Sequence, residues 1–345
     1  MRARHLLIAC LLVLTRAAAD EVSEAATPYA AAADQRGEEQ TFLTFPEWFL
    51  VFSPAEYATF VRLNTPDHFC FWGHIGQLWG GYASVIHQTT ARHEPTNWGY
   101  HLMIVVISVS TTIEYAVRSG YETLVGRISA ALARGRTAED DYGAQVAQQY
   151  VDFIRVRPWY EFDFWARLRG LWMTTAPFGP DMLRKWERKY ALTSEYTVKA
   201  LYGWVITQAT HSIYDTPIES TTVVVQGASD CQSNISQVSI LRPVSATQTL
   251  LALPRYEAFM EPAVELARCG AQFEEIAGNR TVIVASVIGA LGRTAPFGMP
   301  LMTRQPIITE PGRERLVMIV PIARLATVLR DLKSEDLTLE HLFDY

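Results

Sequence analysis

The spacing of apolar residues changes near Pro217, and this change constrains the fold more than any other feature of the chain. From residue 41 to residue 215 the apolar residues recur at helical spacing, whereas β-branched runs such as Thr221–Val225 follow. The pattern predicts an α+β protein, with a mostly helical N-terminal half (41–215) and an α+β C-terminal domain (218–345). A length of 345 residues agrees with two domains.

Capping residues and prolines divide the N-terminal half into helices. Ser53, Asn97 and Thr137 stand where N-caps are expected, and Pro158 stands where a helix should end. We expect helices that begin near Pro46 and near Pro54, a helix over 71–92, a long helix from Asn97 to about Arg134, a helix from Thr137 toward Arg157, and a helix from Asp181 to about Tyr214.

The C-terminal half has strand-like runs that alternate with two amphipathic stretches, 257–268 and 324–333. The order β-α-β-β, an insertion, then β-α-β resembles that of the ferredoxin-like fold. We expect a hairpin of 271–276 with 281–288 around Gly278, and a loop or arm over the proline-containing insertion 290–314. A likeness in element order implies no function by itself.

The first 19 residues have the pattern of an export signal, with Arg2 and Arg4 before an apolar run and small residues up to Ala19. The alternatives are an uncleaved anchor, for which the run is short, and lipidation at Cys10. Residues 20–40 are expected to form a flexible leader. Cleavage would remove three arginines and no acid, which lowers the formal net charge from −6 to −9 and argues against nucleic acid as a partner.

Basic and aromatic residues are interleaved between Arg155 and Lys199. Trp and Tyr favour the membrane–water boundary, and Arg and Lys favour anionic headgroups. The segment therefore predicts a surface that contacts lipid or another acidic partner, with membrane binding as the main interpretation. Its candidate residues are Arg155, Arg157, Trp159, Tyr160, Trp165, Arg167, Arg169, Trp172, Lys185, Trp186 and Arg188.

The stretch Tyr100–Val117 is apolar and long enough for a short transmembrane helix. Trp98 stands at one end and Arg118 at the other, but Glu114 and four hydroxyl residues lie inside it. A buried helix of a soluble bundle is the equal alternative. If the stretch crosses the membrane, the arginines that follow it place residues 118–199 on the cytoplasmic side; otherwise the mature chain is periplasmic.

Two polar sets on predicted helices have a structural interpretation. His74 and Gln77 share a face of helix 71–92, and Glu114, Arg118 and Glu122 form an i, i+4 series on the long helix. We expect these two faces to pack together as buried polar partners. A buried Glu114 with a raised pKa is the sharper functional alternative.

Histidines gather between residues 68 and 101, together with a cysteine, which makes a metal or haem site conceivable. The candidate ligands are His68, Cys70, His74, His87 and His101. Their spacing matches no zinc pattern, and polar partners in an aromatic core are the other interpretation. Of the other cysteines, Cys231 and Cys269 either pair in an oxidising compartment or are buried thiols.

Common catalytic and nucleotide-binding patterns are absent from the sequence, including GxGxxG, GxSxG, HExxH and CxxC. The phrases FPEWF (45–49) and RPWYEF (157–162) resemble stretches of bacterial proteins of unknown function, which implies no activity or site. We therefore expect an exported, membrane-associated, non-enzymatic protein of the cell envelope, at the inner membrane or in the periplasm. It should need no cofactor, bind lipid, and use its C-terminal domain for a protein partner or self-association. The alternatives are a metal- or haem-dependent enzyme and a binder of lipid or another apolar molecule.

Overall fold

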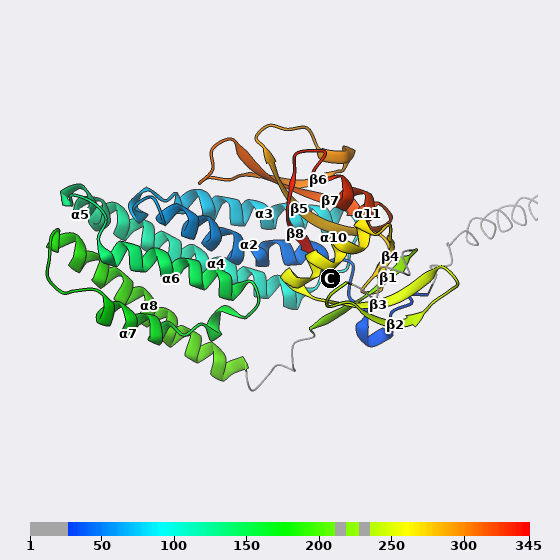
Figure 1. Ribbon diagram of the computed structural model, residues 1–345, viewed down its shortest axis with the longest axis horizontal. Coiled ribbons are helices and arrows are strands. Elements are labelled where there is room, and N and C mark those ends of the chain that lie inside the picture. Colours follow the sequence, from blue (N-terminus) through cyan, green and yellow to red (C-terminus); the bar gives the residue numbers. More distant parts are fainter. Residues whose placement is uncertain (1–26, 211–218, 228–234) are drawn as a thin grey trace, which may run out of the picture.

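The computed structural model describes residues 27–210, 219–227 and 235–345. Helices dominate the N-terminal half, and two antiparallel sheets of four strands form the C-terminal part, so the α+β prediction is confirmed. The helices lie along the long axis of the molecule; one sheet lies beyond one end of the bundle, and the other lies beside the first two long helices toward the same end (Figure 1). The predicted export signal, 1–19, lies outside the described residues.

The bundle consists of long helices joined by short turns. These are α2 (Gln40–Val61), α3 (Phe71–Ala91), α4 (Trp98–Tyr121), α5 (Arg127–Leu132), α6 (Ala138–Ile154), α7 (Phe164–Thr174) and α8 (Met182–Thr210), with short turns η2 (Pro66–His68) and η4 (Trp159–Glu161). A π-helical turn, η3 (Glu122–Gly126), joins α4 to α5 without a break. Two predicted caps are present: Asn97 accepts from Tyr100 N, and Thr137 forms a capping box with Asp140.

Two predictions for the start of the helical half were wrong. Pro46 and Pro54 do not begin separate helices but lie inside α2. Ser53 does not cap a helix, because its hydroxyl is hydrogen-bonded to His74 and Tyr115. The described part of the expected flexible leader is also packed: the backbone N–H groups of Tyr29 and Ala30 donate to the buried carboxylate of Glu275.

The two sheets repeat one chain path. Sheet A has the order β2-β3-β1-β4, and sheet B has the order β6-β7-β5-β8. In sheet A a helix connects β3 to β4, which lie on either side of β1. In sheet B a helix connects β7 to β8, which lie on either side of β5. The second unit begins 62 residues after the first, as Ser220 and Val282 show. The elements are β1 (Ser220–Gln226), β2 (Ser239–Pro243), β3 (Gln248–Pro254), η5 (Tyr256–Phe259), α10 (Met260–Arg268), β4 (Gln272–Ile276), β5 (Val282–Ala290), β6 (Leu301–Pro306), β7 (Arg313–Pro321), α11 (Ile322–Asp331) and β8 (Thr338–Phe343).

This topology refines the ferredoxin-like expectation. The split β-α-β arrangement occurs twice, once in each sheet, instead of once in a single sheet. The expected hairpin of 271–276 with 281–288 was wrong, since β4 pairs with β1 whereas β5 pairs with β7 and β8. The insertion 290–314 is not only a loop, because it contains β6, an edge strand that tolerates its terminal proline.

Helix α2 connects the bundle to sheet B. Its aromatic residues, including Phe45 and Phe52, share a core with Val284, Ile319 and Phe343 of the sheet. At the start of α2, the Thr41 hydroxyl donates to Phe343 O at 2.6 Å and accepts from Val284 N at 2.9 Å. The helical half and sheet B are therefore packed as one unit.

Candidate functional site

Helix α8 has its charged residues inside the bundle. Arg184, Lys185, Glu187, Arg188 and Lys189 are all less than 10% exposed. Each needs partners, because an unpaired buried charge costs several kcal/mol. This charged side of α8 faces the neighbouring helices α5, α6 and η3.

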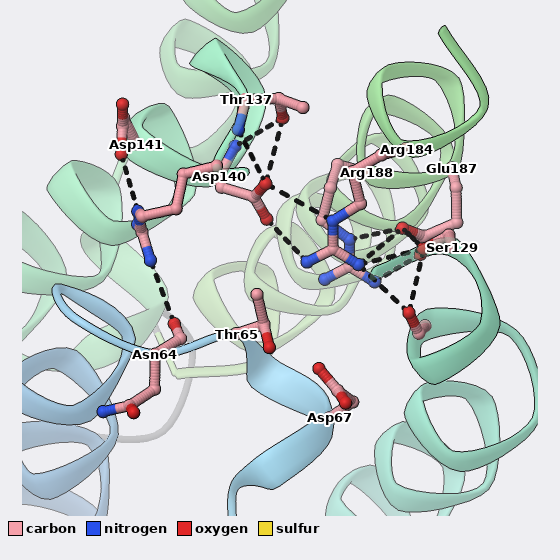
Figure 2. A network of polar contacts seen from close by, with 12 residues as sticks. Asn64, Thr65, Asp67, Ser129, Thr137, Asp140, Asp141, Arg184, Glu187 and Arg188 are labelled. Carbon is pink, nitrogen blue, oxygen red and sulfur yellow. Dashed lines mark hydrogen bonds and ion pairs between the residues drawn. The ribbon is translucent and has the colours of Figure 1, made fainter. Parts of the chain in front are cut away.

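The charged side of α8 is matched by acids from α6 and η3. Arg184 donates to Asp140 at 2.7 Å, and Arg188 donates to Glu122 at 2.9 Å. Both guanidinium groups also reach Glu187, and Figure 2 shows them side by side next to Ser129. Bidentate and charge-assisted bonds of this kind offset the loss of hydration.

Two further layers of ion pairs extend this network along α8. Lys185 Nζ lies 3.0 Å from both carboxylate oxygens of Glu139. Nearer the sheets, Lys199 pairs with Glu114 of α4 at 3.0 Å, and Arg118 of α4 lies 3.5 Å from Glu195. Residue numbers increase along α4 while those of their partners on α8 decrease, so the two helices are antiparallel and in contact.

The outer side of α8 is apolar. Among its described residues no charged side chain is exposed, yet nine large apolar ones are. They are Met182, Leu183, Trp186, Tyr190, Val198, Leu201, Tyr202, Trp204 and Val205. A surface helix of a water-soluble protein has the opposite arrangement, with its apolar stripe inside and its charges outside.

The α4–α5 helix has a matching outer stripe. Its exposed large residues recur at helical spacing and are Trp98, Leu102, Met103, Val106, Val109, Ile113, Val117, Leu124, Val125, Ile128 and Leu132. Within the described residues, Trp98–Leu132 is the one helix that length and composition would allow to cross a membrane. Tyr121 and Tyr190 are in ring contact where α4 meets α8. We call the outer sides of α4, α5 and α8 together the apolar face.

The structure separates the predicted membrane-binding residues into three groups. Trp165, Trp172 and Trp186 are exposed, as are Arg155, Arg157 and Arg169, although Arg155 pairs with Glu257 at 2.9 Å. Trp159, Tyr160 and Arg167 are half-buried. Lys185 and Arg188 were assigned wrongly, because their ion pairs hold them inside the bundle, away from any lipid headgroup.

The two polar faces expected to pack together have different partners. Glu114, Arg118 and Glu122 face α8, as described above. Gln77 instead donates to Pro306 O of sheet B at 2.6 Å. His74 lies between α2 and α4, where it is fully buried.

The candidate metal ligands are dispersed. His68, Cys70 and His87 are exposed, while His101 is hydrogen-bonded to Tyr82 OH at 2.9 Å. In the part of the chain that the structure describes, no three His, Cys, Asp or Glu side chains are grouped as a metal site. Helical spacing explains the dispersal, since residues 13 apart such as His74 and His87 point to different sides of α3.

A second buried polar cluster joins the bundle to sheet B, and no local sequence pattern predicts it. Arg315 of β7 binds both carboxylate oxygens of Glu340 of β8, at 2.6 and 2.7 Å. The same guanidinium donates to Glu56 of α2 at 3.2 Å and lies over the Phe52 ring. Glu56 in turn lies 3.6 Å from His74 of α3.

Burial governs the protonation of this second cluster. Desolvation raises the pKa of Glu56 to about 7, against the opposing effect of Arg315. Desolvation and the charge of Arg315 lower the pKa of His74 to about 4. Near neutral pH, His74 is therefore uncharged, and Glu56 exchanges a proton in the physiological range.

Comparisons with known proteins identify no relative. No family model matches the chain, and neither a curated protein nor a solved structure is similar to it.

Of the described cysteines, Cys70 is free and exposed, whereas Cys269 is disulfide-bonded. Cys231, its candidate partner from the sequence, lies outside the described residues.

Proposed function

We propose that this chain is a membrane-associated, non-enzymatic protein whose apolar face is immersed in lipid. The inverted arrangement of α8 carries this proposal, because its charges lie inside and its large apolar side chains lie outside. An apolar side chain gains about 1.5–3 kcal/mol when it is moved fully out of water. Contact with acyl chains would supply this gain along the whole face.

The distribution of polar residues favours a bundle that lies along the membrane surface over one that crosses it. The outer side of α6 exposes Asp141, Gln145 and Asp152. The part of this side near Asp152 lies at the level of the middle of the apolar face, because the Tyr150 ring lies under Lys199, which pairs with Glu114 of α4. A crossing bundle would place the exposed carboxylate of Asp152 in the hydrocarbon region, at high cost.

The length of the apolar face supports the same orientation. At 1.5 Å per residue, the 35 residues of Trp98–Leu132 extend about 52 Å, well beyond a hydrocarbon core of about 30 Å. Exposed arginines lie beside the face: Arg127 is next to Ile128 on α5, and Arg169 shares a side of α7 with Trp165 and Trp172. Arginine and tryptophan in this position suit the headgroup region.

Two observations support the remaining parts of the proposal. The disulfide at Cys269 agrees with an exported protein of the cell envelope, because disulfides persist in oxidising compartments. Strand β2 is an edge of sheet A with all five residues exposed, Ile240 and Leu241 among them. Such an edge is suited to strand pairing with a protein partner or a second copy.

The test of this proposal is fractionation of cells that express the full chain, followed by an alkaline wash of the membranes. We expect the protein to sediment with the membranes and to float with anionic vesicles after purification in detergent. The variant Ile113→Glu/Val117→Glu places two charges on the apolar face and should lose vesicle binding. Gln145→Glu/Gln148→Glu adds the same charge to α6 and should retain it. A wild-type protein recovered in the soluble fraction would overturn the proposal.

A further inference from the structure

Two buried atoms face each other without a hydrogen-bond partner at the junction of α2 and α3. Glu56 Oε2 and His74 Nε2 lie 3.6 Å apart, and neither has another partner among the described residues. His74 is fully buried and Glu56 is 9% exposed. Buried polar atoms are nearly always paired, so this arrangement requires an explanation. A single proton between the two atoms would satisfy both.

The other atoms of both groups are held in place. Glu56 Oε1 accepts from Arg315, which sets the direction in which Oε2 points. His74 Nδ1 lies 2.9 Å from Ser53 Oγ, and Ser53 Oγ lies 2.7 Å from Tyr115 OH. If Nδ1–H donates to Ser53, and Ser53 donates to Tyr115, then Nε2 is left as an acceptor that faces Glu56.

The charges around the pair also favour one added proton. Arg315 is already matched by Glu340, so an ionised Glu56 leaves a buried cluster with one negative charge in excess. Glu310, in the loop before β7, adds to the negative potential at Glu56. The neighbouring polar groups are uncharged: Ser53 of α2 contacts His74, Tyr115 of α4 contacts Ser53, and Gln305 of β6 contacts Arg315. One proton neutralises the cluster.

We propose that Glu56 and His74 form a proton-binding site, in which one exchangeable proton is held between Glu56 Oε2 and His74 Nε2 and joins α2 to α3 where Glu56 also contacts Arg315 of sheet B. The proton resides on the carboxyl group and is donated to the neutral imidazole. Its loss leaves an unmatched carboxylate at the contact of α2, α3, β7 and β8. The site does not depend on membrane association.

The sign of the pH dependence follows from the two opposite shifts. The pKa of Glu56 is raised to about 7, so the stability that its proton contributes is present at low pH and is lost as pH rises through about 7. The pKa of His74 is lowered from 6.5 to about 4, so the cost of keeping its ring neutral grows as pH falls from about 6.5 to about 4. Between about pH 4.5 and 6.5 the folded pair and the unfolded pair each bind about one proton, and their contributions cancel.

The first test is the infrared spectrum of the wild-type chain and of Glu56→Gln in detergent. At about pH 6 the carbonyl band of protonated carboxylic acids should contain a component in the wild type that E56Q lacks, and this component should be lost at about pH 8.5. Asp152→Asn removes an exposed carboxyl group and should leave the band unchanged. Identical bands in the wild type and E56Q at pH 6 would overturn the proposal, because Glu47 and Asp344, whose pKa values burial also raises, contribute equally to both spectra.

Two further measurements keep the test decisive if E56Q folds poorly. In the wild type, the nitrogen NMR signals of His74 should show a neutral ring with the proton on Nδ1 down to about pH 5. A charged His74 at pH 6 contradicts the proposal. Between about pH 4.5 and 6.5 the unfolding equilibrium constant of the wild type should stay nearly constant, whereas that of E56Q should fall by up to tenfold per pH unit, because only the lowered pKa of His74 then acts.

Discussion

Arg184 of α8 and Asp140 of α6 form a 2.7 Å ion pair in which both side chains are almost fully buried. The pair does more than neutralise two charges. Asp140 is also the residue that closes the capping box of α6 with Thr137, so one carboxylate fixes the start of α6 and its contact with α8. Arg184 also donates to Ser129 Oγ and to Gly126 O, so the π-helical turn η3 is bonded to the same guanidinium group.

Replacement of Arg184 by Met should therefore destabilise the fold strongly. Loss of one partner of a buried pair costs about 3–5 kcal/mol, because the remaining carboxylate stays buried without its cation. Denaturant unfolding of the detergent-solubilised protein measures this change. The matched control is Arg136→Met, which removes an exposed pair with Asp141 and should cost about 1 kcal/mol or less. Equal losses for the two variants would show that the buried network is not what stabilises the bundle.

The sequence predicts the helices of this bundle better than it predicts their orientation. Asn97 and Thr137 are recognisable as caps because capping is local. Whether Arg188 points into the bundle or out of it depends on Glu122, 66 residues earlier in the chain. The basic and aromatic residues of 155–199 do indicate two chemically different sides, but nothing local in the sequence shows which side is outside. The expectation of a basic membrane surface was wrong at Lys185 and Arg188 for this reason.

The C-terminal half shows the same limit in another form. Single strands such as β1 and β7 are predicted by their β-branched residues. Strand β6 follows Pro300 and ends at Pro306, and these prolines make a loop the expected structure from sequence alone. The two sheets repeat one path without an evident repeat in the sequence, so only the strand pairing reveals the duplication. The Glu56–His74–Arg315 cluster was missed because its members are up to 259 residues apart.

Thr41 offers a test of the connection between the helical half and sheet B. Thr41→Val keeps the shape of the side chain but removes the hydroxyl that donates to Phe343 O and accepts from Val284 N. Leaving such buried groups unpaired costs about 1–3 kcal/mol, and the unfolding free energy should fall by this amount. Thr59→Val, at an exposed position of the same helix, should stay within about 0.5 kcal/mol of wild type. If T41V behaves like T59V, the contact contributes nothing to stability.

The orientation of the bundle can be measured by labelling at the two ends of the apolar face. Cys70 is a free, exposed thiol, so the parent for this experiment is Cys70→Ser. Thr96→Cys precedes α4 and Arg134→Cys follows α5, and both positions are exposed. A bundle that lies along one membrane surface presents both thiols on the same side, because the helix between them never crosses the bilayer. An impermeant maleimide should then label both variants in right-side-out vesicles or both in inverted vesicles.

A crossing helix gives a different result, in which each preparation labels one of the two variants. That outcome would leave membrane association intact but overturn the surface orientation, and it would require Asp152 of α6 to face a second protein or a water-filled space instead of lipid. Asp152→Cys distinguishes these cases. On a bundle that lies along the surface this position faces water, and it should react as fast as Thr96→Cys in the same preparation. A protected thiol at residue 152, together with labelling of the two ends from opposite sides, would mean that α6 is covered by another subunit.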